Sequence, residues 1–148
     1  SWEILKDMAK DMIMQFTNQD LSDDEIYHRL DEMAFNEIDS IDLPSIAPHF
    51  LGERWDMNSK ASITGLTQNN FTISKIAAAL LIGMASNLKH NLPKKCFEKR
   101  NCIIANGNAI KKNKSLRKAI EKVFQMPVKL ADTIEDAAMG AAILPFVR

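Results

Sequence analysis

The sequence predicts a mixed α/β fold of one domain, and three observations support this class. Segments typical of strands and of helices alternate from residue 62 onward, which favours strands that pair in parallel through helical connections. Residues 1–60 show helical periodicity followed by loop signals, so residues 61–148 are expected to form the α/β core. With 148 residues, 46% of them apolar and 26% charged, the chain has the composition of a single domain with a buried core.

Two helices are expected before this core. Apolar residues recur three and four positions apart from Trp2 to Phe16, which predicts an amphipathic helix. Ser22 and Glu25 have the spacing of a capping box at the start of a second helix, which ends near Asn36. The methionines of the first helix suit either a groove for a partner protein or gaps in the core, and we expect them to fill the core.

A connecting region without regular structure is expected between residues 39 and 60. Pro44 and Pro48 interrupt any periodicity in Asp39–Pro48, so this segment is predicted to be loop. The next stretch, residues 50–60, contains Gly52 and is predicted to be a structured loop.

The first strand and the longest helix of the core follow. Ser62–Leu66 alternates small or polar residues with apolar ones, which is typical of a short strand. Thr72 can cap a helix whose apolar stripe covers Ile73–Leu88, and Pro93 follows its end. Gly83 lies within this helix, where it costs about 1 kcal/mol relative to alanine unless another segment packs closely against it.

The central motif is a strand, a glycine turn and a helix. Cys102–Ala105 is predicted to be the strand, Asn106-Gly107-Asn108 the turn, and the apolar period of Leu116–Val123 the helix. A short loop before a helix presents unpaired N–H groups and a partial positive charge, which suit a phosphate group. An ordinary strand-to-helix connection explains the same pattern equally well.

The last elements predicted are a strand at Val128–Ala131 and a helix at Glu135–Leu144. Pro127 precedes the strand, and Pro145 ends the helix. The helix is rich in alanine and contains Gly140, so its backbone can closely approach a neighbouring helix or a ligand.

Composition excludes several classes of function. Nineteen basic and nineteen acidic residues balance, so neither nucleic acid nor an anionic membrane is expected as a partner. No segment is apolar enough to span a membrane, and two cysteines without a zinc or redox motif favour a cytoplasmic protein. The chain lacks both common glycine-rich nucleotide motifs, and its three histidines are not spaced as metal ligands, so no catalytic or metal-binding residue is expected.

Taken in order, several motifs resemble the C-terminal domain of the FGGY family of carbohydrate kinases. Within that family the sequence is most similar to the sedoheptulokinases, because Gly107-Asn108-Ala109 is followed by two lysines and Asn113. The motifs that carry the family resemblance are Leu51-Gly52-Glu53-Arg54, Ser62–Thr67, Gly83, Ala105–Asn108 and Glu135–Leu144.

The resemblance implies an incomplete ribonuclease H-like (actin-like ATPase) C-terminal domain with two N-terminal helices. It implies that Gly107, Asn108, Asn113 and Gly140 bind the nucleotide. ATP and magnesium are expected for the full-length enzyme, which would phosphorylate a ketose such as sedoheptulose. The general base, both phosphate loops and most sugar contacts belong to the missing part, so the fragment alone is expected to be inactive.

A function without catalysis is a second interpretation of the sequence. The family turn has two adjacent glycines, whereas this chain has Gly107 alone, which favours an actin-like regulatory or scaffold module that binds a partner protein. The retained order of the motifs favours the kinase. A free-standing α/β domain without a nucleotide role is the third reading.

The resemblance also implies a strand topology. It makes Ser62–Leu66 the third strand of the sheet, Cys102–Ala105 the fourth and Val128–Ala131 the fifth, and the last two are expected to pair in parallel. The first two strands are absent, so Ser62–Leu66 is expected to be unpaired or to pair with the other bare edge or with a second copy of the chain. The Ile73–Leu88 helix is then expected to expose an apolar stripe.

Overall fold

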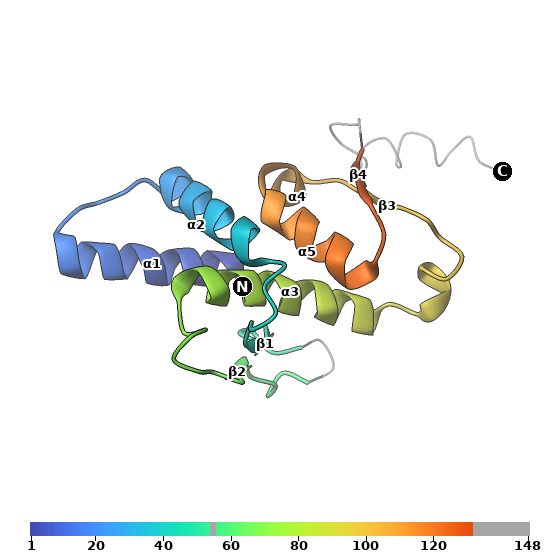
Figure 1. The fold of residues 1–148 in the computed structure, drawn as a ribbon, viewed down its shortest axis with the longest axis horizontal. Coiled ribbons are helices and arrows are strands. Elements are labelled where there is room, and N and C mark those ends of the chain that lie inside the picture. The colour runs from blue at the N-terminus through green and yellow to red at the C-terminus, as the bar shows by residue number, and fades with distance from the viewer. Residues whose placement is uncertain (54–55, 132–148) are drawn as a thin grey trace.

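The computed structural model describes residues 1–53 and 56–131, and it places several helices around one central helix, α3 (Figure 1). Helices α1, α2 and α5 and strand β1 all contact α3. The helices are α1 (Trp2–Thr17), α2 (Asp23–Glu37), α3 (Ile73–Asn91), α4 (Asn108–Lys112) and α5 (Lys114–Phe124), with a 3-10 turn at Lys94–Cys96. The predicted long helices are confirmed, whereas the predicted Glu135–Leu144 helix lies outside the described residues.

Local capping residues determine where two of the helices begin. The side-chain oxygens of Ser22 and Thr72 accept hydrogen bonds from the backbone N–H groups of Glu25 and Lys75, so both predicted N-caps are confirmed. The predicted capping box is only half formed, because the Glu25 carboxylate accepts a 2.7 Å hydrogen bond from Arg29 one turn further along. An i,i+4 ion pair thus replaces the return contact to the cap.

The strands form two separate pairs. Strands β1 (Ser45–Ala47) and β2 (Ser62–Thr64) are antiparallel, with Ile46 opposite Ile63. Strands β3 (Ile103–Ala105) and β4 (Val128–Leu130) are parallel, with Ile104 opposite Lys129. The predicted parallel pair, joined through a helix, is therefore confirmed.

Strand β1 corrects two predictions. The sequence predicts loop for Asp39–Pro48, and it predicts that the Ser62 strand is unpaired or pairs with the bare edge of the Cys102 strand or with a second copy; instead, the two segments pair with each other. Pro44 and Pro48 border β1, and proline is tolerated at the ends of an edge strand because it removes no ladder hydrogen bond there. Three residues are too few to show a period of two, so the sequence carries no signal for this strand.

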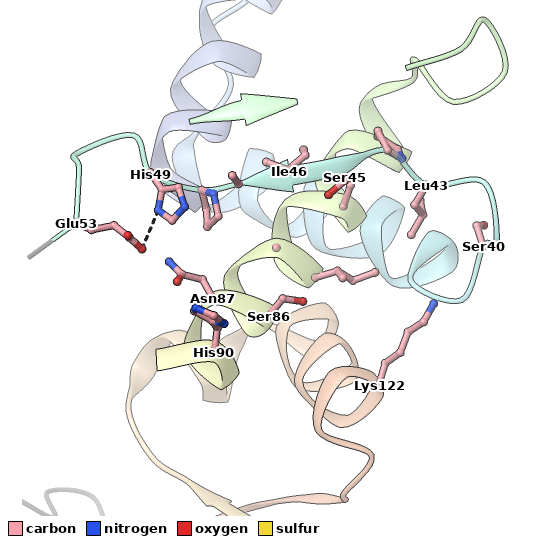
Figure 2. Close-up of a pocket in the computed structure, with 16 residues that line it drawn as sticks. Ser40, Leu43, Ser45, Ile46, His49, Glu53, Ser86, Asn87, His90 and Lys122 are labelled. Atoms are coloured by element: carbon pink, nitrogen blue, oxygen red, sulfur yellow. Dashed lines mark ion pairs between the residues drawn. The ribbon is translucent and has the colours of Figure 1, made fainter. Parts of the chain in front are cut away.

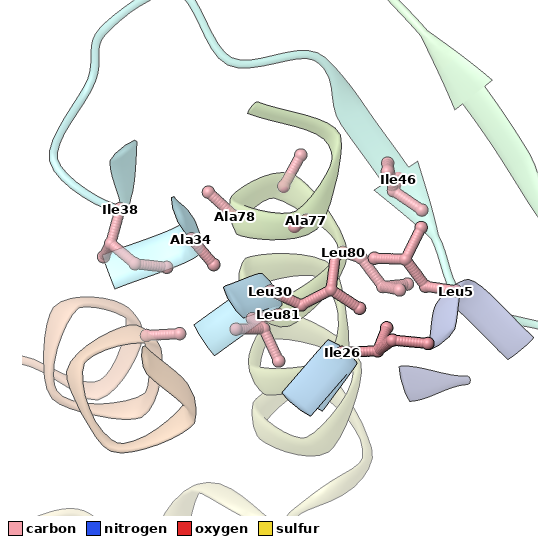
Figure 3. Close-up of a cluster of buried hydrophobic side chains, with 12 residues drawn as sticks. Leu5, Ile26, Leu30, Ala34, Ile38, Ile46, Ala77, Ala78, Leu80 and Leu81 are labelled. Carbon is pink, nitrogen blue, oxygen red and sulfur yellow. The ribbon is translucent and has the colours of Figure 1, made fainter. Parts of the chain in front are cut away.

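The main core lies where α2 and β1 cover α3 (Figure 3). Leu30, Ile38 and Leu81 are among the largest fully buried side chains. The α3 residues facing this core are Ala77, Ala78, Ala79, Leu80 and Leu81. The predicted exposed stripe on this helix is therefore wrong along its middle, and only residues near its ends, such as Ile73 and Leu88, are exposed. Self-association through bare strand edges stays a prediction.

Exposed apolar side chains gather instead on α1. Met8 and Met12 are 46% and 50% exposed, and Phe16 is 83% exposed. The expectation that the methionines of α1 fill the core is thus wrong for Met8 and Met12. Among the described helices, none combines the length and hydropathy needed to cross a membrane.

An ion-pair network joins α1 to α2. The Asp23 carboxylate accepts hydrogen bonds of 2.9 Å from both Lys10 and Lys6. Hydrogen bonds from Lys10 and then Lys6 lower the pKa of Asp23 to about 2. Because the folded-state pKa lies below the unfolded one, this carboxylate adds stability above pH about 4 that is lost as the pH falls toward the folded value.

Asp23→Asn should therefore flatten the acid dependence of stability. The wild-type chain is expected to lose more of its urea midpoint between pH 5 and 2.5 than the variant does, since the variant no longer has the paired Asp23 carboxylate to protonate. Asp24→Asn, an exposed neighbour in the same first helical turn, serves as the control and should keep the wild-type profile. Parallel acid profiles for wild type and Asp23→Asn would contradict the prediction.

Candidate functional site

The glycine turn lies at the carboxyl end of strand β3. Gly107 has φ 109° and ψ 155°, a backbone conformation that L side chains rarely adopt. The Asn106 side chain braces the turn, because its Oδ1 accepts a 2.8 Å hydrogen bond from the Gly107 N–H. A Cβ built on Gly107 would meet no atom of residues 1–53 or 56–131 within 4 Å, so none of these residues fills the space beside this backbone.

The parallel strand pair places the end of β4 next to the same turn. The Ala131 N–H donates a 2.9 Å hydrogen bond to the Ala105 carbonyl, so the carboxyl ends of β3 and β4 lie side by side. In open sheets of parallel strands, ligands bind outside these carboxyl ends. The turn therefore has the position of a ligand-binding loop.

The single-turn helix α4 leads from Gly107 to α5 and is fixed at both ends. The Gly107 carbonyl accepts a 3.1 Å hydrogen bond from the Lys111 N–H. The guanidinium of Arg117 donates hydrogen bonds of 2.7 and 2.9 Å to the carbonyls of Ile110 and Lys111. Because Ile110 is also buried in a second core cluster with Ile120 and Phe124, α4 is held rigidly against α5.

The predicted nucleotide-binding residues differ in their surroundings. Gly107 and Asn108 are both exposed at the turn. Asn113 is buried, and its Oδ1 accepts a 2.6 Å hydrogen bond from the Leu116 N–H, so this side chain caps α5. Gly140 lies outside the described residues. Sequence reasoning missed Arg117, since nothing local predicts that its guanidinium reaches two carbonyl groups of α4.

A second candidate site is a cavity of about 630 Å³ between β1 and α3 (Figure 2). Gly83 lets the two backbones approach, since a Cβ built there would lie 2.1 Å from the Ile46 carbonyl oxygen. The close approach of β1 therefore explains why the helix has glycine and not alanine at this position.

Two histidines that are distant in sequence line this cavity. His49 and Glu53 enter from the loop after β1, whereas His90 enters from α3 (Figure 2). The Nδ1 atom of His49 lies 3.1 Å from the Glu53 carboxylate, but the contact is off the hydrogen-bond direction. Among residues 1–53 and 56–131, no three His, Cys, Asp or Glu side chains are grouped as metal ligands.

Comparisons with known proteins converge on sugar kinases. The family model described as the FGGY family of carbohydrate kinases, C-terminal domain, matches residues 8–148. Sedoheptulokinase of Mus musculus is 27% identical over 125 residues, which cover 83% of this chain and 26% of that protein. Sedoheptulokinase of Homo sapiens is 26% identical over the same length, so the chain spans about a quarter of the curated relatives it matches.

Solved structures agree on the fold. Xylulose kinase from Bifidobacterium adolescentis has a TM-score of 0.63 and 25% sequence identity, over 78% of this chain and 24% of that one. Plasmodium falciparum glycerol kinase with ADP has a TM-score of 0.64 and 20% identity, over 94% of this chain and 27% of that one. The second likeness, at this identity, concerns the fold alone.

The family match and the fold thus define part of a carbohydrate kinase of the actin-like type. The chain belongs to the FGGY family of carbohydrate kinases and matches its C-terminal domain. The predicted family, the predicted partial α/β fold with N-terminal helices and the expected likeness to sedoheptulokinases are all confirmed.

Proposed function

We propose that this chain is the nucleotide-side part of a two-domain, ATP-dependent kinase that phosphorylates a ketose such as sedoheptulose in the cytoplasm. The observation that carries the proposal is the Gly107 turn at the carboxyl end of β3, where the backbone is left-handed and no described residue occupies the position of a Cβ. That combination lets a nucleotide lie directly against the main chain. The family membership supplies the reaction class.

Each predicted residue has a definite role in this proposal. Gly107 and Asn108 contact the adenosine part of ATP through the exposed backbone of the turn. Asn113 acts indirectly, because its side chain caps α5 and so fixes the C-terminal end of α4. Gly140 completes the nucleotide site from the last predicted helix.

The reacting groups belong to the remainder of the enzyme. ATP supplies the phosphoryl group, and its transfer depends on positioning and on stabilising charge at the phosphate oxygens. We assign magnesium, the general base and the sugar contacts to the rest of the enzyme, as the family resemblance implies. The chain alone is then expected to be inactive as a kinase.

Gly107→Val tests the nucleotide role. A β-branched residue is strained at φ 109°, and its side chain would occupy the space assigned to ATP. In the full-length enzyme the KM for ATP is expected to rise by roughly tenfold or more, the effect of about 1.4 kcal/mol of lost binding, while the KM for the sugar stays unchanged. Steady-state kinetics with each substrate varied in turn measure both values.

The matched control is Gly65→Val. Gly65 also has a positive φ, of 73°, and a Cβ built there would meet no described residue within 4 Å. It comes directly after β2, however, and is not part of the Asn106–Asn108 turn. This variant shares the backbone strain and should keep the wild-type KM for ATP. An unchanged ATP dependence in folded Gly107→Val would support an ordinary strand-to-helix connection.

One observation favours the scaffold alternative. A cavity of about 740 Å³ between α1 and α2 is lined by Met12, Ile13 and Met33, beside the exposed methionines of α1. Methionine-rich surfaces adapt to apolar helices of partner proteins. Titrating ADP into the full-length protein discriminates between the two functions, because a scaffold need not bind nucleotide.

A further inference from the structure

Asp31, on α2, is a buried acidic residue whose side chain joins two helices that are distant in the sequence. Its side chain is 9% exposed and reaches the start of α5, 84 positions away in the sequence. Oδ1 accepts hydrogen bonds from the Ser115 N–H at 2.9 Å and from the Ser115 hydroxyl at 2.7 Å. Oδ2 accepts a 3.2 Å hydrogen bond from the Lys114 N–H.

Asp31 therefore completes the N-terminal cap of α5 from another helix. A helix begins with N–H groups that have no partner inside the helix, and a carboxylate there also interacts favourably with the helix dipole. Asn113 satisfies the Leu116 N–H from within the local sequence, and Asp31 satisfies the two N–H groups before it. The position of α5 along its own axis is thus fixed by α2.

The fixed start of α5 is separated from the glycine turn only by α4. Asn113 is both the last cap of α4 and the first cap of α5, so the two helices share one junction. Arg117, on the first turns of α5, holds two carbonyl groups of α4. Asp31, Asn113 and Arg117 therefore hold successive residues of the α4–α5 junction by hydrogen bonds, and the main chain connects this junction to the residues that follow Gly107.

We propose that Asp31 is a positioning residue for the nucleotide, acting through α5 and α4 on the Gly107 turn. The inference rests on the proposed function, and it gives the N-terminal helices a role in ATP binding. A misplacement of about 1 Å in a site can slow a reaction roughly 100-fold. Loss of a supporting hydrogen bond behind a metal site commonly costs about 10- to 100-fold in affinity or activity, and we expect the lower end of that range for the nucleotide.

Asp31→Asn separates positioning from folding. The amide keeps the shape of the carboxylate and an acceptor for Ser115, but it can turn a donor toward the Lys114 N–H. In the full-length protein, calorimetric titration with ADP is expected to give a Kd roughly tenfold higher than that of the wild type. A loss of folded protein alone lowers the measured stoichiometry and leaves the Kd unchanged, so the two effects are distinguishable.

Lys118→Met is the matched control. Lys118 also ties α5 to the end of α2, through a 3.0 Å hydrogen bond to the Phe35 carbonyl and a 2.9 Å ion pair with Asp39. It lies one helical turn beyond the start of α5 and should leave the Kd for ADP unchanged. An unchanged Kd in Asp31→Asn, with ADP binding intact in the wild type, would overturn the positioning role alone, whereas a wild type that binds no ADP overturns the proposed function as well.

Hydrogen exchange of the wild-type protein supplies a second measurement that needs no variant. Coupling between two sites is reciprocal, so a ligand at the turn must also stabilise the contact made by Asp31. ADP is expected to slow amide exchange in residues 103–113 and also in residues 114–118 and 26–35. Protection confined to residues 103–113 would overturn the inference.

Discussion

Asp31→Ala is expected to lower the free energy of unfolding of the chain by about 3 kcal/mol, which is the largest single effect we predict. The substitution removes a buried carboxylate and leaves the N–H groups of Lys114 and Ser115 without their acceptor. The buried Ser115 hydroxyl loses its 2.7 Å contact with Oδ1 but keeps the Asp31 backbone carbonyl as an acceptor. Donors buried without a partner cost more than the hydrogen bonds contributed, because the unfolded chain hydrates them.

Urea unfolding followed by circular dichroism measures this loss. Glu32→Ala, at the exposed neighbouring position of the same helix, is the control and should change stability by less than about 0.5 kcal/mol. Ser115→Ala removes only the hydroxyl and should cost about 1 kcal/mol. If Asp31→Ala unfolds at the wild-type midpoint, the α2–α5 contact does not contribute to stability.

Gly83→Ala is expected to destabilise the chain by about 2 kcal/mol, although alanine is the better helix former. The added methyl group would lie 2.1 Å from the Ile46 carbonyl oxygen, which is backbone and cannot rotate away. Strand β1 must therefore move off α3, and the buried Ile46 side chain must move with it. The helical gain of about 1 kcal/mol offsets only part of this cost.

Thermal and urea unfolding of Gly83→Ala check the sign as well as the size. Ser86→Ala, an exposed position on the next turn of α3 and in the same cavity, should be neutral or slightly stabilising. Greater stability in Gly83→Ala than in the wild type would show that β1 does not pack on α3 as Figure 2 shows.

The sequence by itself determined the features whose causes are local. Helix periodicity and the caps at Ser22 and Thr72 depend on residues within one turn, so α1, α2 and α3 were predicted near their observed bounds. The Gly107 turn was also predictable, because a glycine between an apolar strand and a helical period can adopt a positive φ without a steric clash. The order of short motifs then identified the family.

Only the tertiary structure decided the features that join distant segments. Strand β1 exists because β2 supplies its hydrogen-bond partners, and three residues between prolines carry no periodic signal of their own. The Asp31 cap of α5 spans 84 positions, and an acidic residue on a helix is usually solvated, so its burial could not be inferred from its neighbours. The sequence left open whether a segment packs against Gly83, and the contact with Ile46 depends on how β1 crosses α3. Pairing and burial of this kind are set by which surfaces meet in the folded chain, whereas caps and periodicity are set by the geometry of a single element.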